Sequence, residues 1–270
     1  MSNLALEIPA QSNLQVADLQ PRAVLSKEIL DLLRRMTILV GAVGKDGIVL
    51  AADKKFLQPA PCSELLHDMS GGRKINHLES EDKEWGIVYA FAGDEVAKIA
   101  GDAIKANLKD GSFVFSDIDA SLTDAANRAV SSYTNRTGRN PDLQSVPRHL
   151  IAILYGKKFG IQPSLWRVNI QSNNCSTALN IDELVIAGAH GNFARFFGRY
   201  CMKDSSVERL ERIAAHMVLK AHDYDSLAIE GFHIVKVTND GVFHEMTRAE
   251  EDELRQKSAE LDRTMTTLFD

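Results

Sequence analysis

Residues 36–53, MTILVGAVGKDGIVLAAD, decide how the rest of this chain is interpreted. Two short runs rich in β-branched and aliphatic residues, 37–43 and 48–53, flank the tetrapeptide Gly44-Lys45-Asp46-Gly47. An Asp-Gly pair between two such runs predicts a β-hairpin, because it supplies the positive φ angles that a tight turn between twisted strands requires. Neither run alternates between apolar and polar residues, so we expect a sheet that is buried on both faces.

Three polar residues stand at the ends of predicted strands. Thr37 opens the first strand of the hairpin, Asp53 closes the second, and Lys74 begins the next predicted strand, 74–78. Each has an ordinary structural interpretation, since threonine is common in strands and an aspartate and a lysine form ion pairs in many folds. The order and spacing of these residues along the chain are what suggest a role beyond structure.

Short matches to a known family follow one another along the chain. They are Val40-Gly41, Asp46-Gly47, Leu50-Ala51-Ala52-Asp53, Lys74-Ile75 and Ala92-Gly93. In this order the chain resembles proteasome β-type subunits and their bacterial two-ring homologues, which are N-terminal-nucleophile threonine peptidases. The resemblance runs over residues 37–245. It implies an α+β fold, the four-layer αββα sandwich of the N-terminal-nucleophile hydrolases, and hydrolysis of peptide bonds.

The order of predicted elements agrees with a layered α+β domain. We expect helices at 94–108, 117–133, 191–200 and 207–221. We expect further strands at 85–93, 149–155, 165–170, 183–188, 231–238 and 242–245, the last two joined by Asn239-Asp240-Gly241 as a second hairpin.

The chain divides into three parts on these patterns. Residues 1–36 form an N-terminal extension with a helix from Ser26, which is a propeptide, a ring-contact helix or an ordinary packing helix. Residues 37–246 form the hydrolase-like domain. Residues 247–270 form a highly charged C-terminal helix that begins with the capping-box pair Thr247 and Glu250.

The chemistry that these residues support depends on a free Thr37 amine. A hydroxyl is a weak nucleophile and needs a base, and an α-amine with a pKa of about 7.7 to 8.0 is suited to that task near neutral pH. Lys74, as a nearby cation, would lower the pKa of that amine, and Asp53 would hold Lys74 in place. The N–H of Gly93, at a strand-to-helix turn, is the expected oxyanion donor.

The resemblance implies further site residues. Asp223 and Ser226 match an Asp-x-x-Ser pair that supports the nucleophile, although a helix end and turn explain them equally, and the two glycines usual after that serine are absent. Lys55, in the long connection 54–72, and Phe91, before Ala92-Gly93, are placed in the substrate pocket. An aromatic side chain there predicts a preference for small or medium apolar residues before the cleaved bond.

Two departures from the family bear on activity. The chain has Gly188-Ala189-His190-Gly191 where the family has Gly-Ser-Gly-Ser, so either catalysis is weakened or His190 substitutes for the missing hydroxyl. Met36 precedes Thr37 in place of the usual glycine, so Thr37 becomes terminal either because synthesis starts at Met36 or because residues 1–36 are removed. The competing hypothesis is a catalytically inactive, ring-forming homologue with a structural role.

Composition narrows the remaining alternatives. The net charge of −6 with no dense Lys/Arg block disfavours a nucleic-acid surface. Three widely spaced cysteines indicate a reducing compartment, and eight histidines without ligand spacing predict no metal site. The N-terminus lacks a secretory signal, and no apolar run approaches the roughly 20 residues of a membrane helix. We therefore expect a cytoplasmic protein without a cofactor.

The expected partners follow from the resemblance. They are a peptide or unfolded-protein substrate and further copies of the same chain in a ring or double ring, while an ATPase unfoldase stays an open alternative. Charge and hydropathy predict no nucleic-acid partner and no membrane.

Overall fold

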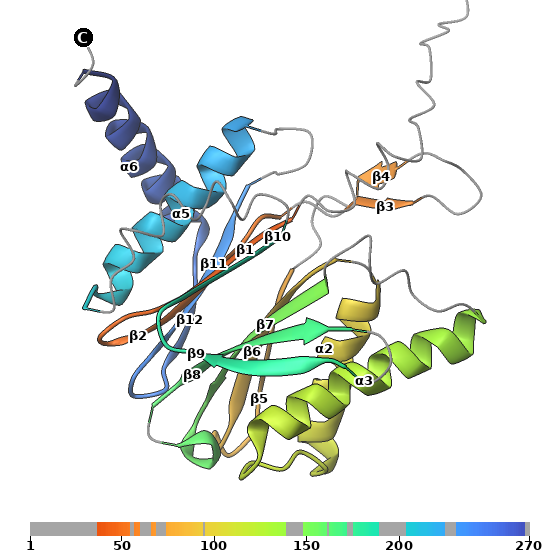
Figure 1. Ribbon diagram of the computed structural model, residues 1–270. Coiled ribbons are helices and arrows are strands. Elements are labelled where there is room, and N and C mark those ends of the chain that lie inside the picture. The colour runs from red at the N-terminus through yellow and green to blue at the C-terminus, as the bar shows by residue number, and fades with distance from the viewer. Residues whose placement is uncertain are drawn as a thin grey trace, which may run out of the picture.

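The computed structural model describes most of the chain from Thr37 onward (Figure 1). The described residues are 37–54, 57–59, 66–68, 74–93, 95–138, 148–160, 162–171, 175–188, 204–224 and 231–267. The helix expected from Ser26 and the helix expected at 191–200 lie outside these residues.

Two five-stranded antiparallel sheets form the centre of the molecule. The first sheet has the order β10-β1-β2-β11-β12, and the second has the order β5-β6-β7-β8-β9. The strands of the first sheet are β1 (Ile38–Val43), β2 (Gly47–Ala52), β10 (Leu184–Gly188), β11 (His233–Thr238) and β12 (Phe243–Glu245). Those of the second are β5 (Ile75–Glu79), β6 (Gly86–Ala92), β7 (Arg148–Tyr155), β8 (Ser164–Ile170) and β9 (Thr177–Ile181).

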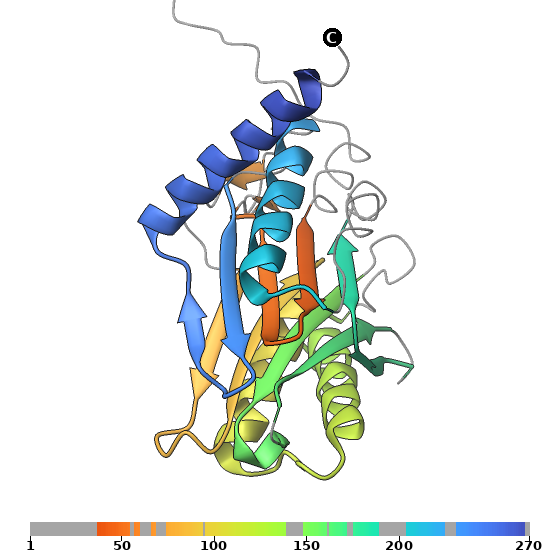
Figure 2. The same cartoon turned by 90° about the vertical axis from the view of Figure 1, so that its left-hand side faces the viewer.

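Four α-helices lie on the outer faces of the two sheets within the described part of the chain. They are α2 (Glu95–Asp110), α3 (Ile118–Thr137), α5 (Val207–Tyr224) and α6 (Arg248–Thr267), with a short 3-10 turn at Lys157–Phe159. Helices α2 and α3 cover the second sheet, whereas α5 packs on the first sheet and α6 crosses over α5 (Figures 1 and 2). The fold is therefore α+β, as the sequence predicted.

Three apolar clusters account for this arrangement. One joins α2 and α3 to the second sheet, one joins α5 and α6 to the first sheet, and one contains residues of both sheets. Strand β6 shows why, because Ile87 and Tyr89 belong to the cluster under the helices while Val88 and Ala90 belong to the cluster between the sheets. Burial on both faces explains why these strands are apolar throughout.

Both predicted hairpins are present in the first sheet. Strands β1 and β2 pair with Leu39 opposite Ala52, and all six residues of β2 are buried, as expected from its sequence. Strands β11 and β12 pair with Val235 opposite Glu245. The capping box at the start of α6 is also confirmed, since Glu250 accepts a hydrogen bond from the Thr247 N–H at 2.7 Å and the Thr247 hydroxyl accepts one from the Glu250 N–H at 3.3 Å.

Sequence patterns missed the strands with little apolar content. Strand β9 has no fully buried residue, so it lacks an alternating signal, and it pairs with β8 and contacts α3. Strands β3 (Leu57–Pro59) and β4 (Leu66–Asp68) pair with each other inside the stretch that we expected to be a plain connection. Segments of three residues are too short to show any periodicity.

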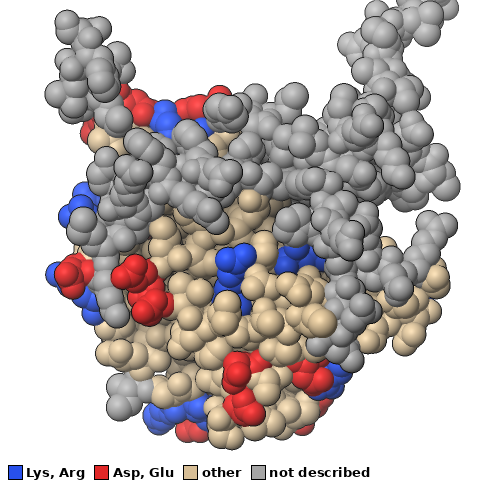
Figure 3. Space-filling model, viewed as in Figure 1, with Lys and Arg blue, Asp and Glu red and all other residues tan. Residues whose placement is uncertain are grey.

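The surface carries both signs of charge in small groups. On the described part of the face in Figure 3, Lys and Arg lie apart from one another within a largely uncharged surface. None of the described helices combines the length and the apolar character that crossing a bilayer requires.

Candidate active site

The β1–β2 hairpin places Asp53 directly beside the first residues of β1. The Ile38 N–H donates a hydrogen bond to Asp53 Oδ1 at 3.0 Å, and the Asp53 N–H donates one to the Ile38 carbonyl at 3.3 Å. Since Thr37 directly precedes Ile38, the hairpin brings Thr37 and Asp53 together although 15 residues separate Ile38 from Asp53. This part of the site is therefore local in sequence.

Lys74 completes the group from the other sheet. It stands immediately before β5, and its Nζ donates hydrogen bonds to Asp53 Oδ2 at 2.6 Å and to Thr37 Oγ1 at 3.2 Å. The Asp53 side chain is fully buried and that of Lys74 is 3% exposed. The structure thus brings Thr37, Asp53 and Lys74 into one hydrogen-bonded chain, with the ion pair between Asp53 and Lys74 that the sequence suggested.

Two opposing effects act on the ammonium group of Lys74. Burial lowers the pKa of Lys74 below its ordinary value of 10.5, while the charge and the hydrogen bond of Asp53 oppose that effect. A buried ion pair contributes little net stability, since desolvating the two charges offsets most of their attraction. Perturbed, buried pairs of this kind are typical of functional sites.

Gly188 fixes the backbone of Thr37 from the neighbouring strand. Ile38 pairs with Gly188 at the end of β10, where Gly188 has a φ of +105°. A Cβ atom at this position would lie only 1.6 Å from the Thr37 carbonyl oxygen. In the sequence, Gly188 stands out only as the first residue of the Gly188-Ala189-His190-Gly191 departure from the family pattern. An isolated glycine at the end of a predicted strand was the signal that could have identified it.

Gly93 lies at the strand-to-helix turn where the oxyanion donor was expected. It has a φ of +119° and stands between the end of β6 at Ala92 and the start of α2 at Glu95. Glycine is suited to this backbone conformation, which other residues rarely adopt. Its role in binding an oxyanion stays a prediction.

The remaining predicted site residues are less closely tied to Thr37. Phe91 is half-buried and packs against the cluster that joins α2 and α3 to the second sheet. Asp223 lies near the end of α5, where its exposed carboxylate pairs with Lys220 at 2.7 Å. Lys55, Ser226 and the Ala189-His190 turn lie outside the described residues. The supporting roles of these residues stay predictions.

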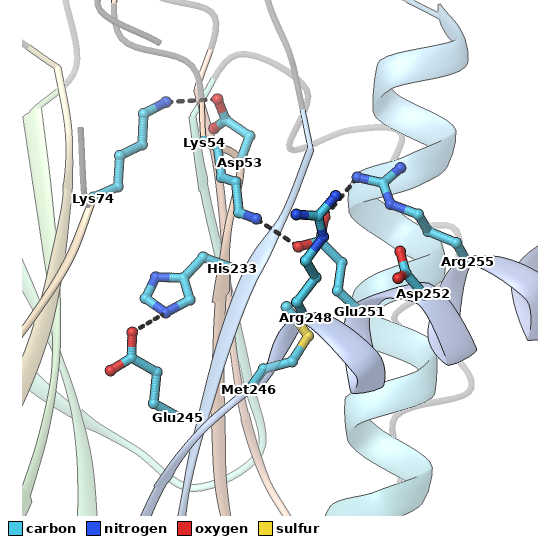
Figure 4. A pocket seen from close by; sticks show the side chains of 10 residues that line it. All are labelled: Asp53, Lys54, Lys74, His233, Glu245, Met246, Arg248, Glu251, Asp252 and Arg255. Carbon is cyan, nitrogen blue, oxygen red and sulfur yellow. Dashed lines mark hydrogen bonds and ion pairs between the residues drawn. The ribbon is translucent and has the colours of Figure 1, made fainter. Parts of the chain in front are cut away.

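A cavity of about 640 Å³ opens beside the Asp53–Lys74 pair (Figure 4). It is lined by Asp53, Lys54, Lys74, His233, Glu245, Met246, Arg248, Glu251, Asp252 and Arg255. Close contacts join several of the lining side chains, since Lys54 Nζ lies 2.6 Å from Glu251 Oε2 and His233 Nε2 lies 2.9 Å from Glu245 Oε1. The contact between Lys54 and Glu251 could not be predicted from sequence patterns, because the two residues are 197 positions apart.

A metal centre finds no support in the described part of the chain, where no three histidine, cysteine or carboxylate side chains gather as metal ligands would.

Comparison with known proteins identifies the fold. No protein-family profile and no curated protein sequence matches this chain. Among solved structures, a Gly-1 mutant of Anbu from Hyphomicrobium sp. strain MC1 is similar at a TM-score of 0.65 and 15% identity, over 86% of this chain and 96% of that one. Anbu, described as an ancestral beta-subunit, from Yersinia bercovieri has a TM-score of 0.66 at 10% identity, with 86% and 96% covered.

A third similar structure comes from a larger assembly. It is the helical assembly of the Anbu complex from Pseudomonas aeruginosa, with a TM-score of 0.64 and 15% identity over 85% of this chain and 96% of that one. At such low identity these likenesses establish the fold alone: this chain has an Anbu-like, proteasome-related fold.

The family resemblance drawn from the sequence is corrected by these findings. The similar structures are Anbu proteins, a proteasome-like but distinct family, and no sequence match supports a proteasome β-type subunit or its bacterial two-ring homologues. The short matches that suggested them, such as Asp46-Gly47 and Leu50-Ala51-Ala52-Asp53, lie in the buried β1–β2 hairpin. Residues that the fold itself requires do not distinguish between families that share it.

Proposed function

We propose that this chain is a threonine-type endopeptidase with an Anbu-like fold, in which Thr37 is the nucleophile once it is the first residue of the mature chain. Its two sheets and four described helices form the four-layer αββα sandwich of the N-terminal-nucleophile hydrolases in this proposal. Residues 37–246 are the hydrolase domain, residues 1–36 are removed or never made, and residues 247–270 are the C-terminal helix.

One observation supports the proposal more than any other. A single buried ammonium group, Lys74 Nζ, donates hydrogen bonds both to the Asp53 carboxylate and to the Thr37 hydroxyl, at 2.6 Å and 3.2 Å. A structural ion pair has no need of the second contact. A positive charge beside Thr37 Oγ1 favours the alkoxide form of the hydroxyl, which is the form that attacks a carbonyl carbon.

The proposed mechanism has two steps with the same residues. The free Thr37 amine accepts the hydroxyl proton while Oγ1 attacks the carbonyl carbon of the peptide bond, and the Gly93 N–H stabilises the resulting oxyanion. The amine then gives its proton to the departing amine of the product, which leaves an ester on Thr37. Water, activated by the same amine, hydrolyses the ester and restores Thr37.

The positive charge of Lys74 also acts on the base. It disfavours a second positive charge nearby, so it lowers the pKa of the α-amine and keeps more of it neutral at working pH. Asp53 holds Lys74 in place through one carboxylate oxygen while its other oxygen is fixed by the Ile38 N–H.

The experiment uses a peptide epoxyketone, an electrophile whose ring adduct needs both a hydroxyl and a free α-amine on the same residue. Protein expressed from Met36, so that methionine removal leaves Thr37 terminal, should gain the mass of one inhibitor on the Thr37 peptide. Thr37→Ala should gain none. The full chain from residue 1 should react only after the bond before Thr37 is cleaved, which intact-mass measurement follows directly.

The alternative is a catalytically inactive homologue with a structural role. It is favoured by the sequence as written, in which the Thr37 nitrogen belongs to a peptide bond and Ala189 replaces the expected serine. If assembled protein that begins at Thr37 forms no adduct, the peptidase proposal fails and this alternative takes its place.

Assembly is the second part of the proposal. The Anbu complex from Pseudomonas aeruginosa is described as a helical assembly, and we extend to this chain the expectation that identical subunits associate. Head-to-tail contacts close into a ring when the rotation per subunit closes, and otherwise form an open helix. Peptide or unfolded protein is the proposed substrate, and an ATPase unfoldase is a candidate partner.

A further inference from the structure

The first turn of α6 reaches the end of β2, the strand that leads into Asp53. Lys54, the residue after Asp53, donates a hydrogen bond from Nζ to Glu251 Oε2 at 2.6 Å. The other oxygen of Glu251 accepts a hydrogen bond from Arg255 at 2.7 Å. Figure 4 shows Glu251 between these two cations on one side of the cavity, with Asp53 and Lys74 on the other.

Burial distinguishes Glu251 from an ordinary surface partner. Its side chain is 14% exposed, whereas those of Lys54 and Arg255 are 43% and 40% exposed. Burial acts to raise the pKa of Glu251, but the hydrogen bonds from Lys54 and Arg255 outweigh it and leave that pKa lowered. The carboxylate is therefore charged and bound at both oxygens.

Two residues that precede β11, Gly231 and Phe232, lie against the partners of Glu251. Gly231 has a φ of +57°, and a Cβ atom there would lie 3.2 Å from Lys54 Cδ. The Arg255 guanidinium lies 5.1 Å above the ring of Phe232, which is fully buried under α5 and α6. Phe232 directly precedes β11, whose His233 pairs with Ala52 of β2, so the contact is anchored on the strand beside Asp53.

Helix α6 is itself held against α5. Ser258 contacts His216 Nδ1 at 2.8 Å, and Asp262 contacts Lys220 at 2.5 Å. These contacts restrain α6, so the Glu251 side chain is held in position relative to the end of β2.

We propose that Glu251 is a positioning residue for the candidate active site: through Lys54 it holds the end of β2 so that the Asp53 carboxylate stays in contact with both the Ile38 amide and Lys74. Its link to catalysis rests on the proposed function. The position of Asp53 can be followed without any enzymatic activity. Hydrogen exchange of the Ile38 amide reports on its hydrogen bond to Asp53 Oδ1, which is 3.0 Å long.

The test compares Glu251→Gln with a matched control on the same helix. Glu253→Gln removes an equal charge from an ion pair with Lys257 on the same helix, and the Glu253 side chain is 60% exposed. In the full protein, Glu251→Gln should speed hydrogen exchange of the Ile38 amide about tenfold relative to the other amides of β1, as expected when a charge-assisted contact is lost. Glu253→Gln should leave Ile38 unchanged.

Lys54→Met provides the second variant and tests the route of the effect. It should speed Ile38 exchange to the same extent, and the double variant with Glu251→Gln should be no faster than either single variant. An additive double variant would mean that Glu251 acts by another path and would overturn the proposal. So would unchanged Ile38 exchange in Glu251→Gln, even with a lowered melting temperature, because that result marks a structural contact only.

A second measurement separates this inference from the proposed function. In protein that begins at Thr37, the rate of epoxyketone adduct formation and its dependence on pH should change in Glu251→Gln and stay unchanged in Glu253→Gln. If the unaltered protein forms no adduct but Ile38 exchange still responds to Glu251→Gln, the peptidase proposal fails while the positioning of Asp53 stands.

Discussion

At the scale of single residues, the candidate site depends on one carboxylate and one ammonium group, each of which makes two of its hydrogen bonds. The Asp53 carboxylate uses one oxygen for the Ile38 N–H and the other for Lys74, and Lys74 in turn reaches the Thr37 hydroxyl. A displacement of the Asp53 carboxylate would therefore also displace Lys74, and with it the hydrogen bond from Lys74 to the Thr37 hydroxyl. The backbone of Thr37 is fixed just as closely by Gly188.

Gly188→Ala tests that close approach. The added Cβ would lie 1.6 Å from the Thr37 carbonyl oxygen, so either β1 or β10 has to move, and the φ of +105° adds strain. We expect a loss of about 3 kcal/mol or more in unfolding free energy, since strain alone contributes roughly 1–3 kcal/mol. Denaturant unfolding at fixed protein concentration measures it.

Gly160→Ala is the matched control for Gly188→Ala. Gly160 has a φ of +113°, but a Cβ atom there meets nothing within 4 Å. Gly160→Ala should therefore lose unfolding free energy through backbone strain alone, without the further loss that a steric clash causes. Equal losses in the two variants would mean that Thr37 and Gly188 are not in close contact in solution.

At the scale of elements, the start of α6 serves two purposes. The capping box between Thr247 and Glu250 satisfies backbone N–H groups that the first helical turn leaves without partners. One residue further on, Glu251 faces Lys54 and the end of β2. The cap thus sets where the helix begins, and that start determines which carboxylate reaches the strand.

Acid should weaken this cap in a defined window. Hydrogen bonds from the Thr247 backbone, the Thr247 hydroxyl and His244 outweigh the opposing desolvation and lower the pKa of Glu250 from 4.5 to about 2. Because the folded pKa is below the unfolded one, the contribution of Glu250 to stability is complete above pH 4.5 and is lost as the pH falls toward 2. NMR titration of the Glu250 carboxyl should give a midpoint near 2.

Thr247→Ala serves as the control for this titration, since it removes the hydroxyl but keeps the backbone donor. The midpoint should then move only part of the way back toward 4.5. A midpoint near 4.5 in the unaltered protein would show that the capping box does not form in solution.

At the scale of the whole molecule, the apolar face of the helix at 207–221 bears on assembly. Its sequence, with Ile213, Met217 and Leu219 beside Ala214, predicts apolar surface that a neighbouring subunit would cover, and this prediction is wrong. In the structure Ala214 and Met217 are fully buried, and Ile213 and Leu219 pack against the same cluster within this chain. The expectation of assembly now rests on the Anbu-like fold.

We expect the protein at micromolar concentration to have a mass several times that of one 29.8 kDa chain. Light scattering coupled to size exclusion gives that mass, and electron microscopy distinguishes a closed ring from an open helix. The physical reason is that a repeated head-to-tail contact builds one or the other. A monomer under these conditions would contradict the assembly proposal.

The sequence by itself determined the local parts of this protein. Hairpin β1–β2 follows from Asp46-Gly47 between apolar runs, and its register alone sets Asp53 beside Ile38 and hence beside Thr37. The capping box of α6 follows from two residues three positions apart. Both are fixed by turn chemistry and short-range hydrogen bonding, which require no knowledge of the rest of the chain.

Tertiary structure decided everything that joins distant segments. Lys74 reaches Asp53 and Thr37 only because the two sheets pack face to face, and Glu251 reaches Lys54 across 197 residues only because α6 crosses α5. Strand β9 forms because β8 offers it an edge. Packing of apolar faces is non-directional, so composition and periodicity do not identify the partner of a buried side chain. The resemblance to a known family paired Asp53 with Lys74, but nothing in the sequence paired Lys54 with Glu251.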